Sequence, residues 1–335
     1  MKKARTLRIV EVLPQGRDAI LLSLNAEDGG APNLHFVPGQ YLTVAANVDE
    51  EEHWRCYSIT SEPGRERPIS VLVRRVAGGL VSNWICDHAR AGGTLRVLPP
   101  AGRFTLARRG QPVLLFAGGS GIAPIYALAR QALEEGAPEV SLFYANRDRG
   151  TSMMMEELAA LERGAGDRLR ISYWFDSETG LPTQEDLQAP ARGLEAADIY
   201  LCGPDAFAKA VRESTQQLGV DDGRLYMEDF GTPGSEEETG SDDGLEAVMT
   251  VQVKGQVHDV VVKGNQSLLS AMLGAGLQVP HSCKVGECAS CMCRLLEGEV
   301  ERLENSVLDE DDVAEGWILA CSTRVVSKRI RVRIS

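Results

Sequence analysis

The sequence predicts a multidomain protein with three folding units of different class: an antiparallel β-barrel, a doubly wound α/β sheet and a compact α+β module. Three observations predict this order. Short alternating strands fill residues 1–109, apolar strands alternate with helices over 110–230, and a strand pair, a helix and a cysteine-rich loop follow within 247–335. A chain of 335 residues is long enough for each unit to bury a core of its own.

The first unit, residues 1–109, alternates apolar and polar residues in short runs that Gly, Pro and Asp separate. This regular spacing is typical of an antiparallel barrel or sandwich. One helix is expected at 81–88, after the pair Gly78-Gly79. The expected strands are 7–12, 19–24, 41–45, 69–73 and 94–97.

The second unit, residues 110–230, changes to continuous apolar runs with helical stretches between several of them. Such runs indicate buried parallel strands, and the alternation with helices predicts a doubly wound sheet. The expected strands are 112–117, 140–145, 169–174, 198–202 and 224–229.

A short acidic segment separates the second unit from the third. Residues 231–246 hold Gly, Pro, Ser and Thr with six acidic residues and neither Lys nor Arg. This composition cannot bury much apolar surface and predicts a flexible linker, the alternative being a solvated acidic loop within one domain. After it, strands at 248–253 and 258–262, a helix near 267–274 and a last strand at 329–334 predict a compact α+β module.

The net charge of −13 argues against nucleic acid or an anionic membrane surface as the partner, because both repel an acidic protein. A protein partner or a small substrate is expected instead. No apolar run reaches the length of a transmembrane helix, and the N-terminal residues do not form a continuous apolar signal region. We therefore expect a cytoplasmic protein without membrane insertion, and a monomer.

Cysteines are concentrated late in the chain, where Cys283, Cys288 and Cys291 form a CxxxxCxxC loop and Cys321 follows at a distance. Three thiolates on one tight loop with a remote fourth is the spacing of plant-type [2Fe-2S] centres. The alternative is a structural zinc site, which usually shows paired short-spaced knuckles, and only one is present here. Cys293 falls outside the ligand spacing and is expected to be a packed thiol.

Residues 282–291, together with 316–321, resemble the ferredoxin domain of bacterial oxygenase reductases. The resemblance covers about the last ninety residues. It implies a ferredoxin-like β-grasp fold and a one-electron carrier, and it does not name the electron acceptor.

A flavin site is predicted where Arg55, Tyr57 and Ser58 follow one another in the barrel. A flavin needs a cation for its phosphates, an aromatic platform for its ring and a hydroxyl near N5, and these side chains supply all three. About twenty residues later, Gly79 precedes a helix N-terminus whose amides suit a pyrophosphate. FAD is therefore favoured, and FMN is the alternative flavin.

These signals recur in the same order in the ferredoxin-NADP reductase superfamily, which residues 7–230 resemble. The resemblance implies a flavin-binding barrel followed by a nicotinamide-binding α/β domain. The implied flavin contacts are Arg55, Tyr57, Ser58, Ile59, Gly79, Leu80, Val81 and Ser82.

A nicotinamide nucleotide site is predicted where the first strand of the second unit gives way to a helix through Gly119, Gly121 and Pro124. Glycines allow close backbone approach to phosphates, although a tight strand-to-helix turn without a ligand is the alternative. Gly203 and Pro204 end another parallel strand, at the sheet edge where ligands bind.

The superfamily resemblance also implies that Cys202 faces the nicotinamide and that Glu228 lies near the flavin edge. With Ser58 beside the flavin, these residues form the candidate catalytic set. The residues that choose between NADH and NADPH are expected after the second strand, where Arg147 and Asp148 favour opposite nucleotides. Residues 144–149 and 174–183 resemble reductases of ketosteroid 9α-hydroxylases, which implies NADH.

The predicted function is therefore an NAD(P)H-dependent oxidoreductase that passes electrons through FAD and a [2Fe-2S] cluster to a terminal oxygenase of the Rieske type, a steroid 9α-hydroxylase being one candidate. A reductase of a phenylacetyl-CoA epoxidase or of a lipid desaturase is the alternative within electron transfer. A redox-sensing, partner-binding protein is the alternative of another class. Direct reduction of an organic substrate is disfavoured, because no acid–base pair is evident beyond the flavin residues.

Overall fold

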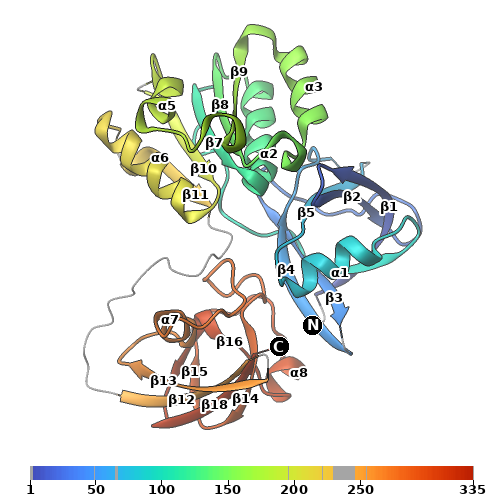
Figure 1. Cartoon of the computed structure of the whole chain (residues 1–335). Coiled ribbons are helices and arrows are strands. Elements are labelled where there is room, and N and C mark those ends of the chain that lie inside the picture. Colours follow the sequence, from blue (N-terminus) through green and yellow to red (C-terminus); the bar gives the residue numbers. More distant parts are fainter. Residues whose placement is uncertain are drawn as a thin grey trace.

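The computed structural model of the chain describes residues 3–48, 50–64, 67–194, 196–220, 222–228, 246–253 and 255–334. An antiparallel sheet, a parallel sheet and a mixed sheet follow one another along the chain, each with its own helices (Figure 1). The predicted multidomain fold is thereby confirmed. Of the predicted linker at 231–246 only Glu246 is described, and the other residues of the linker lie outside the described part of the chain.

The N-terminal sheet has six antiparallel strands in the order β4-β3-β6-β1-β2-β5. Its elements are β1 (Arg5–Gln15), β2 (Ala19–Ala26), β3 (Tyr41–Val48), β4 (Glu51–Ser58), β5 (Ile69–Arg74), α1 (Leu80–His88) and β6 (Thr94–Val97). The two edge strands meet through a bridge between Ile59 and Val71, and the Thr60 amide donates to the Ser70 carbonyl at 2.8 Å. The sheet thus curls into the predicted barrel, whose inward side chains form one apolar core.

The second sheet has five parallel strands in the order β11-β10-β7-β8-β9. These are β7 (Val113–Gly118), β8 (Val140–Asn146), β9 (Leu169–Phe175), β10 (Asp198–Cys202) and β11 (Leu225–Glu228). The chain moves outward from β7 to β9 and then returns to place β10 on the other side of β7. The strand order therefore reverses between β7 and β10, which is the position at which ligands bind in open α/β sheets.

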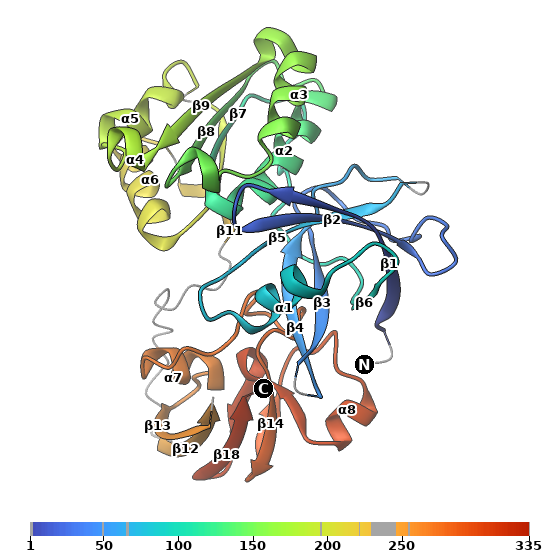
Figure 2. The ribbon, with the colours of Figure 1, turned by 45° about the vertical axis from the view of Figure 1, so that its right-hand side comes forward.

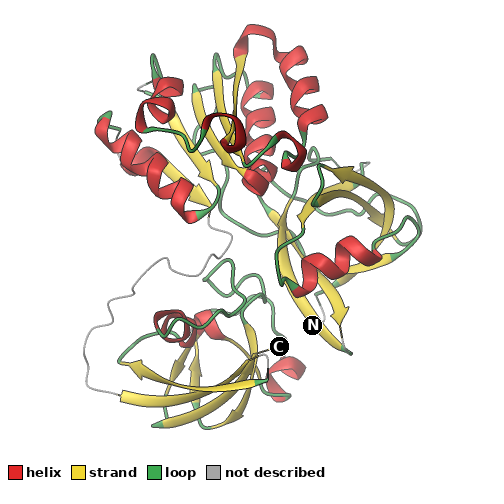
Figure 3. Cartoon of the chain, in the orientation of Figure 1, coloured by secondary structure: helices red, strands yellow, loops and turns green. Residues whose placement is uncertain are grey.

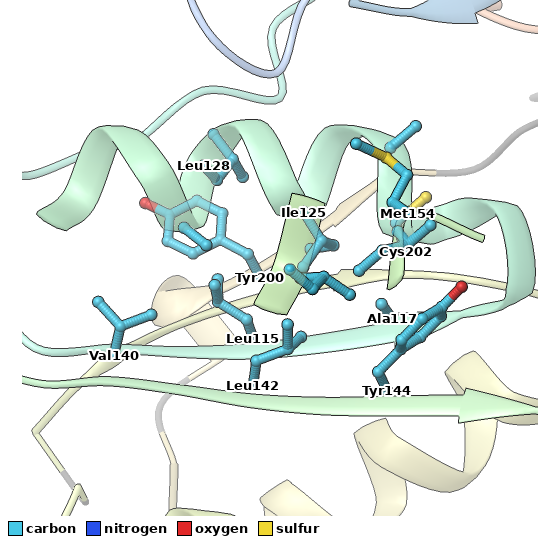
Figure 4. Close-up of a cluster of buried hydrophobic side chains, with 14 of the residues drawn as sticks. Leu115, Ala117, Ile125, Leu128, Val140, Leu142, Tyr144, Met154, Tyr200 and Cys202 are labelled. Carbon is cyan, nitrogen blue, oxygen red and sulfur yellow. The ribbon is translucent and has the colours of Figure 1, made fainter. Parts of the chain in front are cut away.

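Helices cover both faces of the parallel sheet (Figure 3). They are α2 (Ile122–Glu134), α3 (Met155–Ala165), α4 (Asp176–Thr179), α5 (Gln184–Gln188) and α6 (Asp205–Gln217). Side chains of α2 and α3 share one apolar cluster with the sheet, and residues of α5 and α6 share another. Figure 4 shows the first cluster, in which Leu115, Leu142 and Tyr200 from three strands pack beneath Ile125 and Leu128 of α2.

The C-terminal module is a five-stranded mixed sheet in the order β13-β12-β18-β14-β16, in which β12 and β18 are parallel. Its elements are β12 (Glu246–Val253), β13 (Gln256–Lys263), α7 (Leu268–Gly274), β14 (Met292–Glu297), β15 (Val300–Arg302), α8 (Glu310–Ala314), β16 (Trp317–Leu319), β17 (Thr323–Val325) and β18 (Arg329–Ile334). Helix α7 packs on this sheet with Leu268 and Met272 in the core. The arrangement is the predicted β-grasp. Among the described residues, no helix is long and apolar enough to cross a membrane.

The C-terminal module lies against the barrel strands β3 and β4 (Figure 2). Ala45, Trp54 and Leu98 of the barrel are buried in the same apolar cluster as the core of the module. Polar contacts surround this cluster. The Lys3 ammonium donates to the Ser306 carbonyl at 2.6 Å, and Cys56 and Arg103 of the barrel contact the loop that carries the cluster cysteines. The sequence gives no sign of this docking, because the docked segments lie far apart along the chain, as Arg103 and Glu287 do at 184 positions.

Arg130 of α2 ties the parallel-sheet domain to the barrel. Its guanidinium is buried and donates to the Thr60 carbonyl at 3.2 Å and to the Ser61 carbonyl at 2.7 Å.

Replacing Arg130 with Met keeps the aliphatic stem and leaves both carbonyls without this donor. We expect the free energy of unfolding to fall by about 2 kcal/mol, because hydrogen bonds to a charged group are worth roughly 1.5–3 kcal/mol. Urea unfolding curves measure the effect, with the exposed Arg212→Met as the control; equal curves for the two variants contradict the prediction.

Candidate cofactor sites

A cavity of about 280 Å³ opens at the reversal point of the parallel sheet. Gly119, Arg147 and Pro204 line it, so the structure brings three of the predicted nucleotide residues together. They come from the loop after β7, the loop after β8 and the start of α6 respectively. The carboxyl ends of the strands thus form a cavity of the kind in which such sheets bind nucleotides.

Glycines let the strand ends approach each other at the base of this cavity. Gly119 has a φ of +54°, which glycine adopts without strain. A Cβ on Gly121 would lie 2.0 Å from the Cys202 carbonyl oxygen, and one on Gly203 would lie 3.0 Å from the Gly118 Cα. Pro124 occupies the first turn of α2 and is buried. Gly121, Gly203 and Pro124 therefore shape the turn rather than line the cavity.

Two further cavity residues carry buried polar atoms without a partner in the described part of the chain. These atoms are Nε of Arg74 and Oδ1 of Asp176. Burial lowers the pKa of Arg74, and the neighbouring Arg147 charge lowers it further, whereas burial raises the pKa of Asp176. Buried polar groups are almost always paired in native proteins, so these atoms fit a polar ligand such as a dinucleotide.

Two predicted catalytic residues lie side by side at the ends of β10 and β11, where Cys202 pairs with Glu228 in the strand register. Cys202 is fully buried in the apolar cluster between the sheet and α2 (Figure 4). Glu228 is half-buried and is the last residue described before 246. The predicted approach of Cys202 to the nicotinamide and of Glu228 to the flavin edge stays a prediction.

The predicted flavin residues lie on β4 and at the start of α1, which packs over β3, β4 and β5. Arg55 donates to the Trp54 carbonyl at 2.7 Å, and burial lowers its pKa. Burial also raises the pKa of the Tyr57 phenol, although Arg55 opposes this. Strand alternation places Arg55 and Tyr57 on one face of β4 and Ser58 on the other. A cation and an aromatic ring are thus adjacent, as a flavin requires.

Helix α1 begins after Gly79 without a side-chain cap, so its first amides remain available to an anion. The Ser82 hydroxyl accepts from the Val76 amide at 3.2 Å and is buried, as is Val81, whereas Leu80 is exposed. Ile59 is fully buried in the barrel core, so only its backbone remains for the predicted flavin contact. These features fit a pyrophosphate at the helix N-terminus.

The four predicted cluster cysteines converge at one end of the C-terminal module. Three lie on the loop between α7 and β14 and one on the turn after β16: Cys283, Cys288, Cys291 and Cys321. The neighbouring thiols of Cys288 and Cys321 lower the pKa of Cys283, and the thiols of Cys283 and Cys291 raise the pKa of Cys321, so the four side chains lie close together. The remote cysteine therefore reaches the loop as the spacing predicts.

The loop holds Cys283 in the form that binds metal. Its sulfur accepts from the amides of Val285 at 3.5 Å and Glu287 at 3.3 Å. The neighbouring thiols and these amides lower its pKa, and the thiolate is the metal-binding form. Gly286 has a φ of +77°, and a Cβ there would lie 2.5 Å from the Glu304 carbonyl oxygen. A glycine is therefore required for the loop to wrap.

The thiol arrangement bears on the choice between an iron–sulfur cluster and zinc. A [2Fe-2S] centre divides four thiolates between two irons, and four converging cysteines fit this donor set. Cys293 is fully buried on β14, and burial raises the pKa of its thiol, so it is the packed thiol that was expected.

The flavin strand and the cluster loop meet directly. The Cys56 sulfur lies 3.5 Å from the Ser290 hydroxyl oxygen, and although burial opposes it, the neighbouring Cys288 thiol lowers the pKa of Cys56. Arg103, in the segment after β6, forms an ion pair with Glu287 of the loop at 3.3 Å. Cys56 stands between two predicted flavin residues, so no intervening layer separates the predicted flavin strand from the cluster cysteines.

Comparison with known families matches most of the chain in three parts. Residues 8–106 match the oxidoreductase FAD-binding domain, residues 115–213 the oxidoreductase NAD-binding domain and residues 251–326 the 2Fe-2S iron-sulfur cluster binding domain. The order agrees with the cofactor order inferred from the motifs and from the geometry of the three sites.

Individual relatives share this arrangement over nearly their full length. The ferredoxin reductase component of 3-ketosteroid-9-alpha-monooxygenase from Rhodococcus rhodochrous is 38% identical, over 97% of this chain and 95% of the relative. One subunit of the 1,2-phenylacetyl-CoA epoxidase from Escherichia coli strain K12 is 32% identical, over 96% of this chain and 95% of the relative. Among solved structures, phthalate dioxygenase reductase superposes with a TM-score of 0.63 at 26% sequence identity. The match covers 99% of this chain and 98% of the reductase chain.

Proposed function

Because this chain belongs to the family of ferredoxin reductase components of oxygenase systems, with FAD-binding, NAD-binding and 2Fe-2S domains, we propose that it supplies a terminal oxygenase with electrons taken from NADH. When bound, FAD accepts two electrons from the nicotinamide as a hydride and releases them singly to the cluster. The contact of Cys56 with Ser290 and Cys288 carries the proposal, because it joins the flavin strand to the cluster loop within one chain.

The acceptor that we propose is the oxygenase of a ring- or steroid-hydroxylating system of the Rieske type. The Rhodococcus relative, a component of 3-ketosteroid-9-alpha-monooxygenase, supports this choice at 38% identity. A multicomponent epoxidase is the second candidate, supported by the Escherichia coli relative at 32% identity. Neither of these two relatives is named as a redox sensor.

NADH is the proposed nucleotide because of Asp176. Its carboxylate lies at the carboxyl end of β9 and lines the cavity with Oδ1 unpaired. An acidic side chain in this position accepts hydrogen bonds from a free ribose and repels a 2′-phosphate. Arg147 also lines the cavity, but it forms an ion pair with Asp18 at 3.6 Å, which offsets its attraction for a phosphate.

The proposal includes the domain boundaries, the role of the linker, the oligomeric state and the cellular location. We divide it into a FAD-binding barrel at 1–109, a nicotinamide domain at 110–230, an acidic linker at 231–246 and a ferredoxin domain at 247–335. The linker composition supports a tether that lets the ferredoxin domain leave the barrel and reach a partner. A monomer in the cytoplasm is part of the same proposal.

Anaerobic titration of the purified protein tests the proposed electron path. NADH should bleach the flavin and the cluster absorbance in succession, and the reduced sample should show the rhombic EPR signal of a [2Fe-2S] centre. NADPH should be the poorer reductant at equal concentration. A flavin that NADH does not bleach, or a colourless zinc-loaded protein, contradicts the proposal.

A further inference from the structure

Tyr41 presents a buried hydroxyl group to which neither the flavin site nor the nucleotide site assigns a role. The side chain is only 4% exposed, and its Oη has no hydrogen-bond partner in the described part of the chain. A buried polar group without a partner costs about 1–3 kcal/mol, so native structures rarely retain one unless a ligand completes it. The hydroxyl therefore calls for an acceptor that the protein chain itself does not supply.

The position of Tyr41 identifies the side on which that acceptor lies. Tyr41 begins β3 and pairs with Ser58, while Thr43 pairs with Cys56 in the same register. Strand alternation places Tyr41 and Thr43 on one face, and the Thr43 hydroxyl oxygen lies 3.6 Å from the Cys56 sulfur. This is the face on which Cys56 meets the cluster loop at Ser290. Tyr41 is thus on the ferredoxin side of the barrel strand.

Local packing holds the ring of Tyr41 in this place. Gly102 has a φ of +111°, and a Cβ there would lie 3.0 Å from two ring carbons of Tyr41. The Tyr41 amide also donates to the Ala101 carbonyl at 2.9 Å. Burial raises the pKa of the Tyr41 phenol, so the group stays protonated. The phenol is therefore a fixed hydrogen-bond donor.

We propose that Tyr41 of the flavin barrel donates a hydrogen bond to a sulfur of the [2Fe-2S] cluster while the ferredoxin domain is docked, so that docking makes the cluster easier to reduce. This inference rests on the proposed function. The cluster and its thiolates carry negative charge, which makes their sulfurs acceptors for an O–H donor. Hydrogen bonds to the sulfurs are among the features that set the potential of such clusters.

The hydrogen bond favours electron transfer from the flavin to the cluster while the ferredoxin domain is docked. One electron moves from the reduced flavin to the oxidised cluster, no covalent bond is made or broken, and the phenol proton stays on Tyr41. The added negative charge strengthens the hydrogen bond, so the docked domain favours reduction of the cluster. When the domain leaves the barrel, the hydrogen bond is lost and the reduced cluster becomes a stronger donor to the partner.

The test is a redox titration of the full-length protein with both cofactors bound, in which EPR follows the reduced cluster. Tyr41→Phe removes the hydroxyl and keeps the ring against Gly102. We expect the equilibrium constant for cluster reduction to fall about tenfold, which is about 59 mV for one electron, with the flavin potential unchanged. Tyr173→Phe, which removes a half-buried phenol from the parallel sheet, is the matched control and should leave both potentials unchanged.

A second readout distinguishes a lost hydrogen bond from a lost domain contact. Small-angle scattering should give the same radius of gyration for Tyr41→Phe and for the unmodified protein, because the apolar contact at Trp54 is retained. An unchanged cluster potential overturns the proposal, as does a shift confined to the flavin or one accompanied by an expanded molecule. Absence of a [2Fe-2S] signal from the unmodified protein would instead overturn the proposed function, so the two failures are distinguishable.

Discussion

Replacing Cys321 with alanine is expected to abolish reduction of cytochrome c by NADH while leaving reduction of ferricyanide by the flavin largely intact. Cys321 is the one predicted ligand that comes from outside the loop, and its thiol lies near those of both Cys283 and Cys291. Without it, one iron loses half of its protein ligands. Changes to residues that merely support metal ligands cost about 10–100-fold, so loss of a ligand should exceed the upper figure.

A nearby cysteine that is not a ligand provides the control for this variant. Cys293 lies two positions after Cys291, is fully buried and packs in the core of the module. Cys293→Ala should keep the iron–sulfur absorbance and the cytochrome c activity, with a modest loss of stability from the small cavity. The measurements are visible absorbance, iron content and the two acceptor assays. Retention of the cluster in Cys321→Ala, together with its loss in Cys293→Ala, would contradict the ligand assignment.

The extent to which these sites could be predicted depends on how local each one is in the sequence. The cluster loop is nearly all local, because Cys283, Cys288 and Cys291 lie within nine residues and the fourth ligand is the next cysteine but one. Its spacing therefore indicated the chemistry. The β-barrel and the parallel sheet were likewise predictable, because the periodicity of apolar residues differs between a strand exposed on one face and a strand buried on both.

Contacts between domains could not be predicted in this way. Arg74 lines the nucleotide cavity from β5 of the barrel, and Tyr41 lies on the ferredoxin side of β3, so each lies beside a site that belongs to another domain. A sequence shows neither the docking of two domains nor which buried polar atoms it leaves unpaired. Asp176 is an intermediate case, because it lies two positions after the predicted strand 169–174 and could have been selected by its place near the strand end.

The second large effect is expected from Asp176→Ser, which should change the preferred nucleotide from NADH toward NADPH. In the unmodified protein the unpaired Oδ1 can accept a hydrogen bond from a free ribose hydroxyl, whereas a 2′-phosphate would meet a like charge. Hydrogen bonds to a charged group are worth about 1.5–3 kcal/mol, which corresponds to roughly 10–150-fold in kcat/KM for NADH. Serine removes the charge, and Arg147 in the same cavity can then pair with the phosphate.

Steady-state assays with ferricyanide and each nucleotide measure this change as the ratio of the two kcat/KM values. Asp167→Ser, an exposed position in the turn after α3, removes the same charge outside the cavity and should leave the ratio unchanged.

The preference for NADH over NADPH should also depend on pH. Burial raises the pKa of Asp176, and its carboxylate is charged only above that pKa, so the preference for NADH should weaken as the pH falls through it. The Asp176→Ser variant should lack this dependence, because serine has no charge to lose. A ratio that stays the same in both variants would show that the 2′ position of the nucleotide lies elsewhere in the cavity.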